Sequence, residues 1–118
     1  MENPVEIYDL EERGLKFARD IRIFIKVLPK TINNIDDLRQ LSRASGSIGA
    51  NYIEANESLG KKDFVMRAKI SRKEAKETIY WLHLIDTQTK EQEITRHKLI
   101  AEATELLKIL SAIIVKSS

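Results

Sequence analysis

Residues 38–82 read LRQLSRASGSIGANYIEANESLG and then KKDFVMRAKISRKEAKETIYWL, two long segments that meet after Gly60. In each segment, apolar or small residues recur at alternating steps of three and four, which places them on one face of an α-helix. These residues are Leu38, Leu41, Ser45, Ile48, Tyr52, Ala55 and Leu59, and then Phe64, Ala68, Ser71, Ala75, Thr78 and Leu82. Pairing Leu59 with Phe64, Ile48 with Ala75 and Leu41 with Leu82 keeps one constant register. The stretch therefore predicts an antiparallel helical hairpin.

The same spacing continues outside the hairpin and predicts four helices in all. The first should end near Leu28, because Pro29 restricts the residue before it and cannot continue the hydrogen-bond ladder. Asn34 or Asp36 should cap the second helix, and Gly60 should stop it. The third should cover about 62–86 and the fourth about 92–115. The apolar seam of the fourth helix is Leu99, Ala103, Leu106, Leu110 and Ile113.

Composition and loop length set the fold class. The chain has 118 residues, enough for a single domain over 1–118, and only four Gly and two Pro, which favours long helices over many strands. Three short connections imply alternating helix directions. We expect an all-α protein that folds as an antiparallel up-down-up-down four-helix bundle.

The remaining composition excludes several kinds of protein. No cysteine is present, so disulfides and thiolate metal sites are excluded, and a reducing, cytoplasmic location is expected. The first residues lack the basic and apolar regions of a signal peptide, and the most apolar run, 106–115, is too short to cross a membrane. A net charge of +2 permits nucleic-acid binding without requiring it.

The central stretch carries a more specific pattern. SIGANYIEANES, KKDF and KEAKETIYWL together resemble a bacterial four-helix-bundle family of proteins encoded in intervening sequences of 23S ribosomal RNA genes, also called the S23 ribosomal protein family. The accessory variability protein of diversity-generating retroelements is similar. The resemblance implies a bundle that assembles as a ring, commonly a homopentamer, without enzymatic activity or a cofactor. It also suggests nucleic-acid binding.

Small residues in the second helix indicate a close contact. Gly46 and Gly49 lie inside the predicted helix, where each glycine costs about 1 kcal/mol relative to alanine. One interpretation is that another helix, from a neighbouring subunit, approaches this surface, which makes Gly46 and Gly49 oligomer-interface residues. The alternative is tight packing within one bundle. Assembly from identical subunits is therefore expected.

Charged residues inside the hairpin are best interpreted as structural. The predicted register places Glu54 level with Lys69 and leaves Glu77 about one turn from Arg43. We expect an ionic network of Arg43, Glu54, Lys69, Glu74 and Glu77 that sets the register. A di-metal site would need Glu-x-x-His pairs, which the chain lacks, and His83 and His97 alone form a weak site. No catalytic or metal-binding residues are predicted.

Basic residues supply the candidate binding surface. Lys69, Lys73 and Lys76 fall on one stripe of the third helix with Arg72 beside them, and Tyr80 follows one turn later. Lysines suit phosphate contacts and a tyrosine can stack on a base. The alternative is a solvated face whose charges pair with Glu on the second helix. Tyr52, Tyr80 and Trp81 could instead line a small-molecule pocket, although aromatic residues at this spacing more often belong to a core.

Three functional interpretations follow from these features. The first is a non-catalytic homo-oligomeric scaffold, pentameric by resemblance, that binds RNA or DNA through basic helix faces. The second is a protein-interaction scaffold that docks a partner such as a polymerase and does not bind nucleic acid itself. An enzyme with a carboxylate or metal centre is the weakest of the three interpretations, and no membrane partner is expected.

Overall fold

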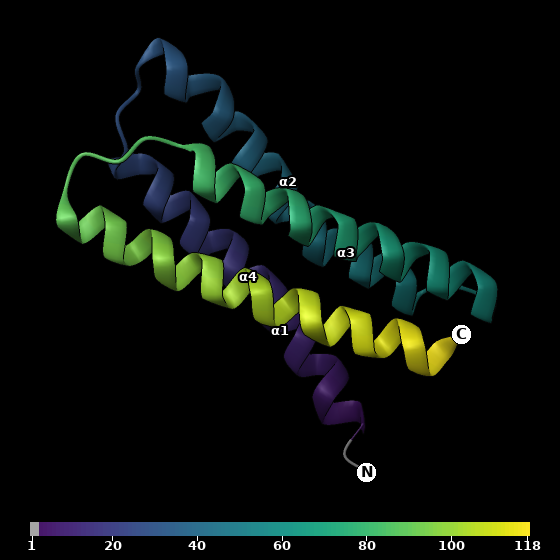
Figure 1. Ribbon diagram of the computed structural model, residues 1–118. Helices are drawn as coiled ribbons and strands as arrows, with labels where there is room; N and C mark the ends of the chain where they lie inside the picture. The colour runs from purple at the N-terminus through teal and green to yellow at the C-terminus, as the bar shows by residue number, and fades with distance from the viewer. Residues whose placement is uncertain (1–2) are drawn as a thin grey trace.

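The computed structural model describes residues 3–118, and their side chains from Leu10 onward. Four helices follow one another: α1 (Asn3–Val27), α2 (Ile32–Asn56), α3 (Lys61–Leu84) and α4 (Lys90–Ser117). Helix α1 packs against α2 and α4, and α3 packs against α2 and α4 (Figure 1). Short loops reverse the chain between consecutive helices. The predicted all-α antiparallel four-helix bundle is confirmed.

One hydrophobic core receives side chains from every helix. Burying a large apolar side chain stabilises a fold by about 1.5–3 kcal/mol, so this core supplies most of the driving force. Its largest fully buried apolar members are Phe17, Ile21, Leu41, Leu82, Ile85, Leu106 and Leu110. The predicted seam of α4 holds except at its end, where Ile114 is buried and Ile113 only partly so. A strict alternation of steps drifts around a straight helix, which accounts for the slip of one residue.

The α2–α3 hairpin has close to the predicted register. The Ser71 hydroxyl donates a hydrogen bond of 2.7 Å to the carbonyl oxygen of Ile48, and both groups are buried. This contact falls one turn from the predicted pairing of Ile48 with Ala75. Ala55, Ala68 and the other central seam residues are buried as expected. The hairpin prediction is therefore correct to within about one turn.

The turn of the hairpin differs from the prediction. Helix α2 ends at Asn56, and the Ser58 hydroxyl donates to the Glu54 carbonyl, so a serine satisfies a terminal carbonyl where a glycine was expected. Gly60 instead precedes α3 as its N-cap residue. Leu59 lies in the loop and is fully exposed. Its predicted pairing with Phe64 is wrong, because the seam spacing continues in sequence past the point where the helix ends.

The N-terminal cap of α2 also differs from the prediction. Thr31 caps the helix, and its hydroxyl accepts from the Asn34 backbone N–H at 3.3 Å. Asn34 is buried, and its amide joins two loops: Nδ2 donates to the carbonyls of Pro29 and Asp86, and Oδ1 accepts from the Asp86 N–H at 2.7 Å. Neither Asn34 nor the exposed Asp36 is the cap.

Candidate nucleic-acid interface

A basic groove lies between α3 and α4. It has a volume of about 310 Å³ and is lined by Lys69, Arg72, Lys73, Lys76, Leu107 and Ser111. The four cations are the residues that the stripe on α3 predicts. Because steps of three and four residues bring side chains onto one side of a helix, α3 presents them together to the edge of α4. The structure thus gathers the predicted basic residues on one surface.

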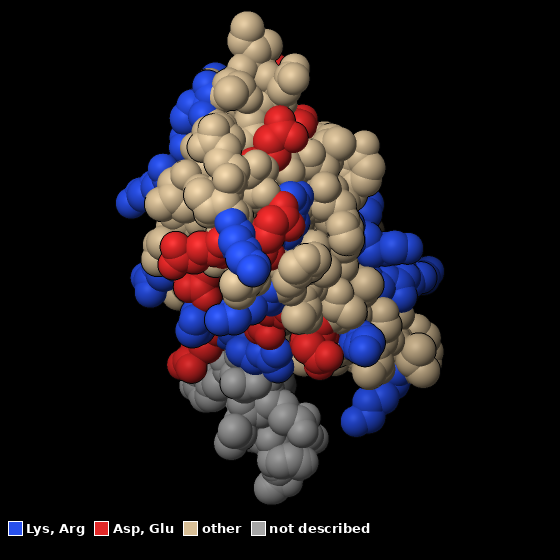
Figure 2. Space-filling model, turned by 60° about the vertical axis from the view of Figure 1, so that its left-hand side comes forward, with Lys and Arg blue, Asp and Glu red and all other residues tan. Residues whose placement is uncertain are grey.

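These cations lack carboxylate partners among the side chains from Leu10 onward. Among the side chains that the structure describes, no Asp or Glu oxygen lies within 4.0 Å of the charged nitrogens of Lys69, Arg72, Lys73 or Lys76. Other charged surface is different: Figure 2 shows Lys and Arg side chains interleaved with Asp and Glu over the middle of one face. Four like charges along one groove favour an anionic ligand.

The predicted ionic network is present in part. Arg43 reaches Glu74 at 3.4 Å and Glu77 at 3.2 Å, and so joins α2 to α3. Glu74 is only 6% exposed, whereas Arg43 and Glu77 are open to solvent. Glu54 and Lys69 are both exposed, and the described contacts include no ion pair between them. Lys69 therefore belongs to the basic groove rather than to a pair with Glu54.

Gly49 lies in a contact within the chain. A β-carbon on Gly14 of α1 would come within 3.2 Å of the Gly49 Cα, and one on Gly49 would lie 3.5 Å from the Gly14 carbonyl carbon. The two helices cross where neither has a side chain, which explains why a glycine is tolerated in the middle of α2. The structure thus supports the alternative of tight packing for Gly49. Gly46 has open space around it and stays a predicted interface residue.

The aromatic residues are divided between core and surface. Tyr52 is buried, and burial raises the pKa of its phenol. Trp81 is half-buried, and Tyr80 is 58% exposed with its ring edge-on to Trp81, at 5.0 Å between centroids. These positions do not form the shared small-molecule pocket considered from the sequence. Tyr80 instead follows the basic stripe by one turn, with its ring accessible to a ligand.

The histidines lie apart from any cluster of metal ligands. His83 and His97 are exposed, and His97 lies 4.0 Å from Glu93. Within the described part of the chain, no group of three His, Asp or Glu residues is arranged to hold a metal ion. No helix among the described residues has an apolar run long enough to span a bilayer.

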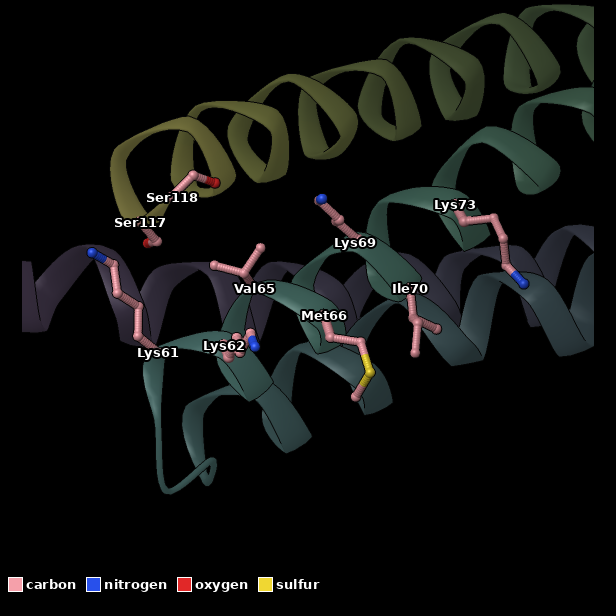
Figure 3. Close-up of a pocket in the computed structure, with 9 residues that line it drawn as sticks. All are labelled: Lys61, Lys62, Val65, Met66, Lys69, Ile70, Lys73, Ser117 and Ser118. Atoms are coloured by element: carbon pink, nitrogen blue, oxygen red, sulfur yellow. The ribbon is translucent and has the colours of Figure 1, made fainter.

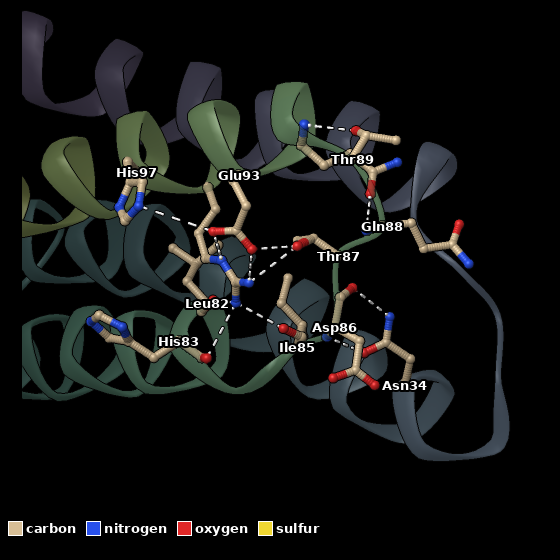
Figure 4. Close-up of polar contacts among 12 residues, drawn as sticks. Asn34, Leu82, His83, Ile85, Asp86, Thr87, Gln88, Thr89, Glu93 and His97 are labelled. Carbon is tan, nitrogen blue, oxygen red and sulfur yellow. Dashed lines mark hydrogen bonds and ion pairs between the residues drawn. The ribbon is translucent and has the colours of Figure 1, made fainter.

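Arg96 holds a polar cluster that the sequence did not reveal (Figure 4). Its guanidinium donates to the carbonyl oxygens of Leu82, His83 and Ile85 at 2.9, 3.2 and 2.7 Å, and so caps the end of α3. Hydrogen bonds from Arg96 and then from the Thr87 hydroxyl lower the pKa of Glu93 to about 2. The sequence signal for this cluster was the spacing of Glu93 and Arg96, which stand three residues apart on one helix. The backbone carbonyls it reaches carry no sequence signature, and the cluster is structural.

Comparisons with known proteins found a matching family model and a similar solved structure. A family model described as 23S rRNA-intervening sequence protein matches residues 7–112. A crystal structure from Bacteroides thetaiotaomicron VPI-5482, of a protein of unknown function from the S23 ribosomal protein family, aligns with a TM-score of 0.78. The two are 33% identical over 89% of this chain and 97% of that chain. No curated protein matches the chain.

Proposed function

Because the chain belongs to the 23S rRNA-intervening sequence protein family, we propose that it is a non-catalytic, homo-oligomeric scaffold that binds nucleic acid. Membership confirms the resemblance seen in the central stretch, except for the accessory variability protein, whose similarity stays a prediction. The basic groove carries the proposal: Lys69, Arg72, Lys73 and Lys76 line one surface without a carboxylate partner among the described side chains. RNA or DNA is the ligand class that such a groove suits.

The geometry of the groove favours a backbone-binding mode. Lys69 and Tyr80 are eleven residues apart on α3, or about 16 Å along the helix, which is enough for several phosphates of a single strand. Lysines act as point charges, and Arg72 adds a planar fork that can grip one phosphate with two hydrogen bonds. Tyr80 offers a face on which any base can stack. Binding should therefore tolerate changes of sequence.

Assembly would strengthen such a site. A single groove with four cations binds weakly at physiological salt, because each phosphate contact adds little once counterions compete. Several copies held in one ring present the groove repeatedly to the same strand, and the later contacts become intramolecular. A homopentamer is the assembly that the family resemblance implies, and we propose it for this chain.

A second function uses the apolar surface instead. Met66 is 48% exposed beside the half-buried Val65 and Ile70, and exposed apolar side chains of this kind favour protein docking. The alternative is therefore a scaffold that docks a partner protein, such as a polymerase, without direct nucleic-acid binding.

The test uses cations that line only the basic groove. Arg72→Glu/Lys76→Glu should abolish binding to generic single-stranded RNA at low salt while helicity and oligomeric mass stay unchanged. Arg22→Glu/Lys98→Glu changes net charge equally at exposed positions elsewhere and should bind as the wild type does. If all four cations contact phosphates, wild-type affinity should fall with salt at a log–log slope of about 0.7 per contact. Failure of the intact protein to bind RNA or DNA at low salt would favour the protein-docking alternative.

A further inference from the structure

A second groove lies at the end of the bundle where α3 begins and α4 ends. It has a volume of about 920 Å³ and runs along the first half of α3 to Ser117 and Ser118. Its apolar part is Val65, Met66 and Ile70 (Figure 3), and we call it the lysine-rimmed groove because Lys61, Lys62, Lys69 and Lys73 surround those side chains. Apolar surface exposed beside charged residues is typical of an interaction site.

The rim sets the chemistry of the occupant. None of the four rim lysines has a carboxylate within 4.0 Å among the described side chains. An occupant that covers Met66 must therefore bring apolar side chains, and negative charges beside them that meet the lysines. A helix with acidic and apolar residues on adjoining stripes meets both conditions.

The chain itself carries a segment of that kind. Residues 2–12 read ENPVEIYDLEE, with five acidic residues and no basic one. Helix α1 begins at Asn3, and in its sequence Glu6 and Asp9 stand three residues apart, each directly preceded by an apolar or aromatic residue, Val5 and Tyr8. The segment therefore combines negative charges with apolar residues, which is the composition that the lysine-rimmed groove favours.

The last residues of the segment are anchored in the chain's own bundle. Leu10 is buried in the chain's own core, and Glu11 accepts a hydrogen bond from Asn56 at 2.7 Å. Among the described contacts α1 packs against α2 and α4 and not against α3. In Figure 1 the first turns of α1 leave the bundle below α4, away from the start of α3.

We propose that the lysine-rimmed groove binds the acidic N-terminal segment, 2–12, of a second copy of this chain. This inference rests on the proposed assembly and names the contact that builds it. The donor segment and the acceptor groove are different surfaces, so the interface is head-to-tail. Such an interface repeats from copy to copy and closes into a ring when the rotation between copies allows it.

The two grooves share a border and can still be tested apart. Lys69 and Lys73 line both, whereas Lys61 and Lys62 line only the lysine-rimmed groove, and Arg72 and Lys76 line only the basic groove. A docked segment therefore leaves the distal half of the basic groove open to a nucleic acid. Variants at the unshared residues separate assembly from nucleic-acid binding.

A charge exchange tests the docking. Lys61→Glu/Lys62→Glu alone and Glu6→Lys/Asp9→Lys alone should each reduce the oligomer to monomers at micromolar concentration, measured by light scattering. Combining all four changes should restore the wild-type mass, because the opposite charges again face each other. Lys90→Glu/Lys98→Glu, at exposed sites on α4, is the control that should keep the oligomer. Circular dichroism identifies any variant that loses its fold.

The outcomes distinguish this contact from the proposed function. A wild-type oligomer that survives both separate pairs of changes, or separate losses without rescue in the combined variant, would overturn the docking and leave the proposed assembly standing. A monomeric wild type would overturn both the assembly and the docking. RNA binding that depends on Arg72 and Lys76 is a separate result and would stand in either case.

Discussion

The two ends of the bundle are built differently. At the end where α3 meets α4 through a loop, Asn34 and Arg96 satisfy backbone groups of the α1–α2 loop, the α3–α4 loop and the end of α3, and both side chains are largely buried. At the opposite end, Leu59 is fully exposed to solvent, Met66 is half exposed, and lysines surround an apolar groove. The first end contributes to the stability of the fold. The second end leaves apolar side chains and positive charges exposed, as is typical of a binding surface.

The largest effect is expected at the closed end, from Asn34→Ala. The change removes the bonds of a buried amide to Pro29 and Asp86, and it leaves the Asp86 N–H without its acceptor. Each buried group left unpaired costs about 1–3 kcal/mol, so the loss should be roughly 3 kcal/mol in thermal or urea unfolding. Asn33→Ala, at an exposed neighbour, should change stability by less than about 0.5 kcal/mol. Equal effects of the two substitutions would show that the closed end is not held by Asn34.

A smaller loss is expected from Arg96→Met, which keeps the aliphatic stem and removes the guanidinium. Three carbonyls at the end of α3 lose a charged donor, and unfolding free energy should fall by roughly 2 kcal/mol. Arg39→Met, at an exposed position on α2, is the matched control and should have little effect. An Arg96 variant as stable as this control would mean that water replaces the guanidinium without loss.

The same cluster predicts a dependence on pH. The pKa of Glu93 is lowered to about 2 from an ordinary value of 4.5, so its contribution is present above pH 4.5 and is lost as pH falls toward 2. Arg96→Met removes the largest cause of that shift. Stability of the wild type should therefore decline more steeply between pH 4.5 and 2 than stability of the variant. Parallel curves over that range would contradict the assignment.

Glu74 and Glu77 provide a comparison within the bundle. Both pair with Arg43, but Glu74 is buried and Glu77 is partly exposed. Exposed ion pairs contribute about 0.2–1 kcal/mol, so Glu77→Ala should cost less than 1 kcal/mol, well below the 3–5 kcal/mol of a buried pair. Glu74→Ala should cost more, because it also opens space beside the core. Chemical denaturation of both variants tests the order, and a larger loss at Glu77 would reverse our assignment of burial.

The smallest effect is expected at the open end, from Leu59→Gln. The side chain is fully exposed, so the substitution should shift unfolding free energy by less than about 0.5 kcal/mol. Leu41→Gln is the contrast, because it places an amide in the core. A clear loss at Leu59 would show that another copy covers this residue in solution, and the loss would then depend on protein concentration.

Periodicity within one helix was enough to predict much of the molecule. Steps of three and four residues predicted the seams of α2 and α3 and the stripe of Lys69, Lys73 and Lys76, and Pro29 predicted the end of α1. Apart from Leu59, the structure places these features as expected. The errors occurred where helices end. Leu59 continues the seam in sequence after α2 has stopped, and Thr31 rather than Asn34 caps that helix.

The sequence by itself determined which faces of the four helices are apolar and which carry charge, because each face is defined by neighbours three or four residues apart. Only the tertiary structure decided the partners across helices. Gly49 packs against Gly14, and Asn34 forms hydrogen bonds with Asp86. Arg96 donates to the carbonyls at the end of α3, and the described contacts include no ion pair between Lys69 and Glu54. Such pairs depend on how far each helix slides and rotates against the next. That placement is set by packing of the whole core, and no local spacing in the sequence encodes it.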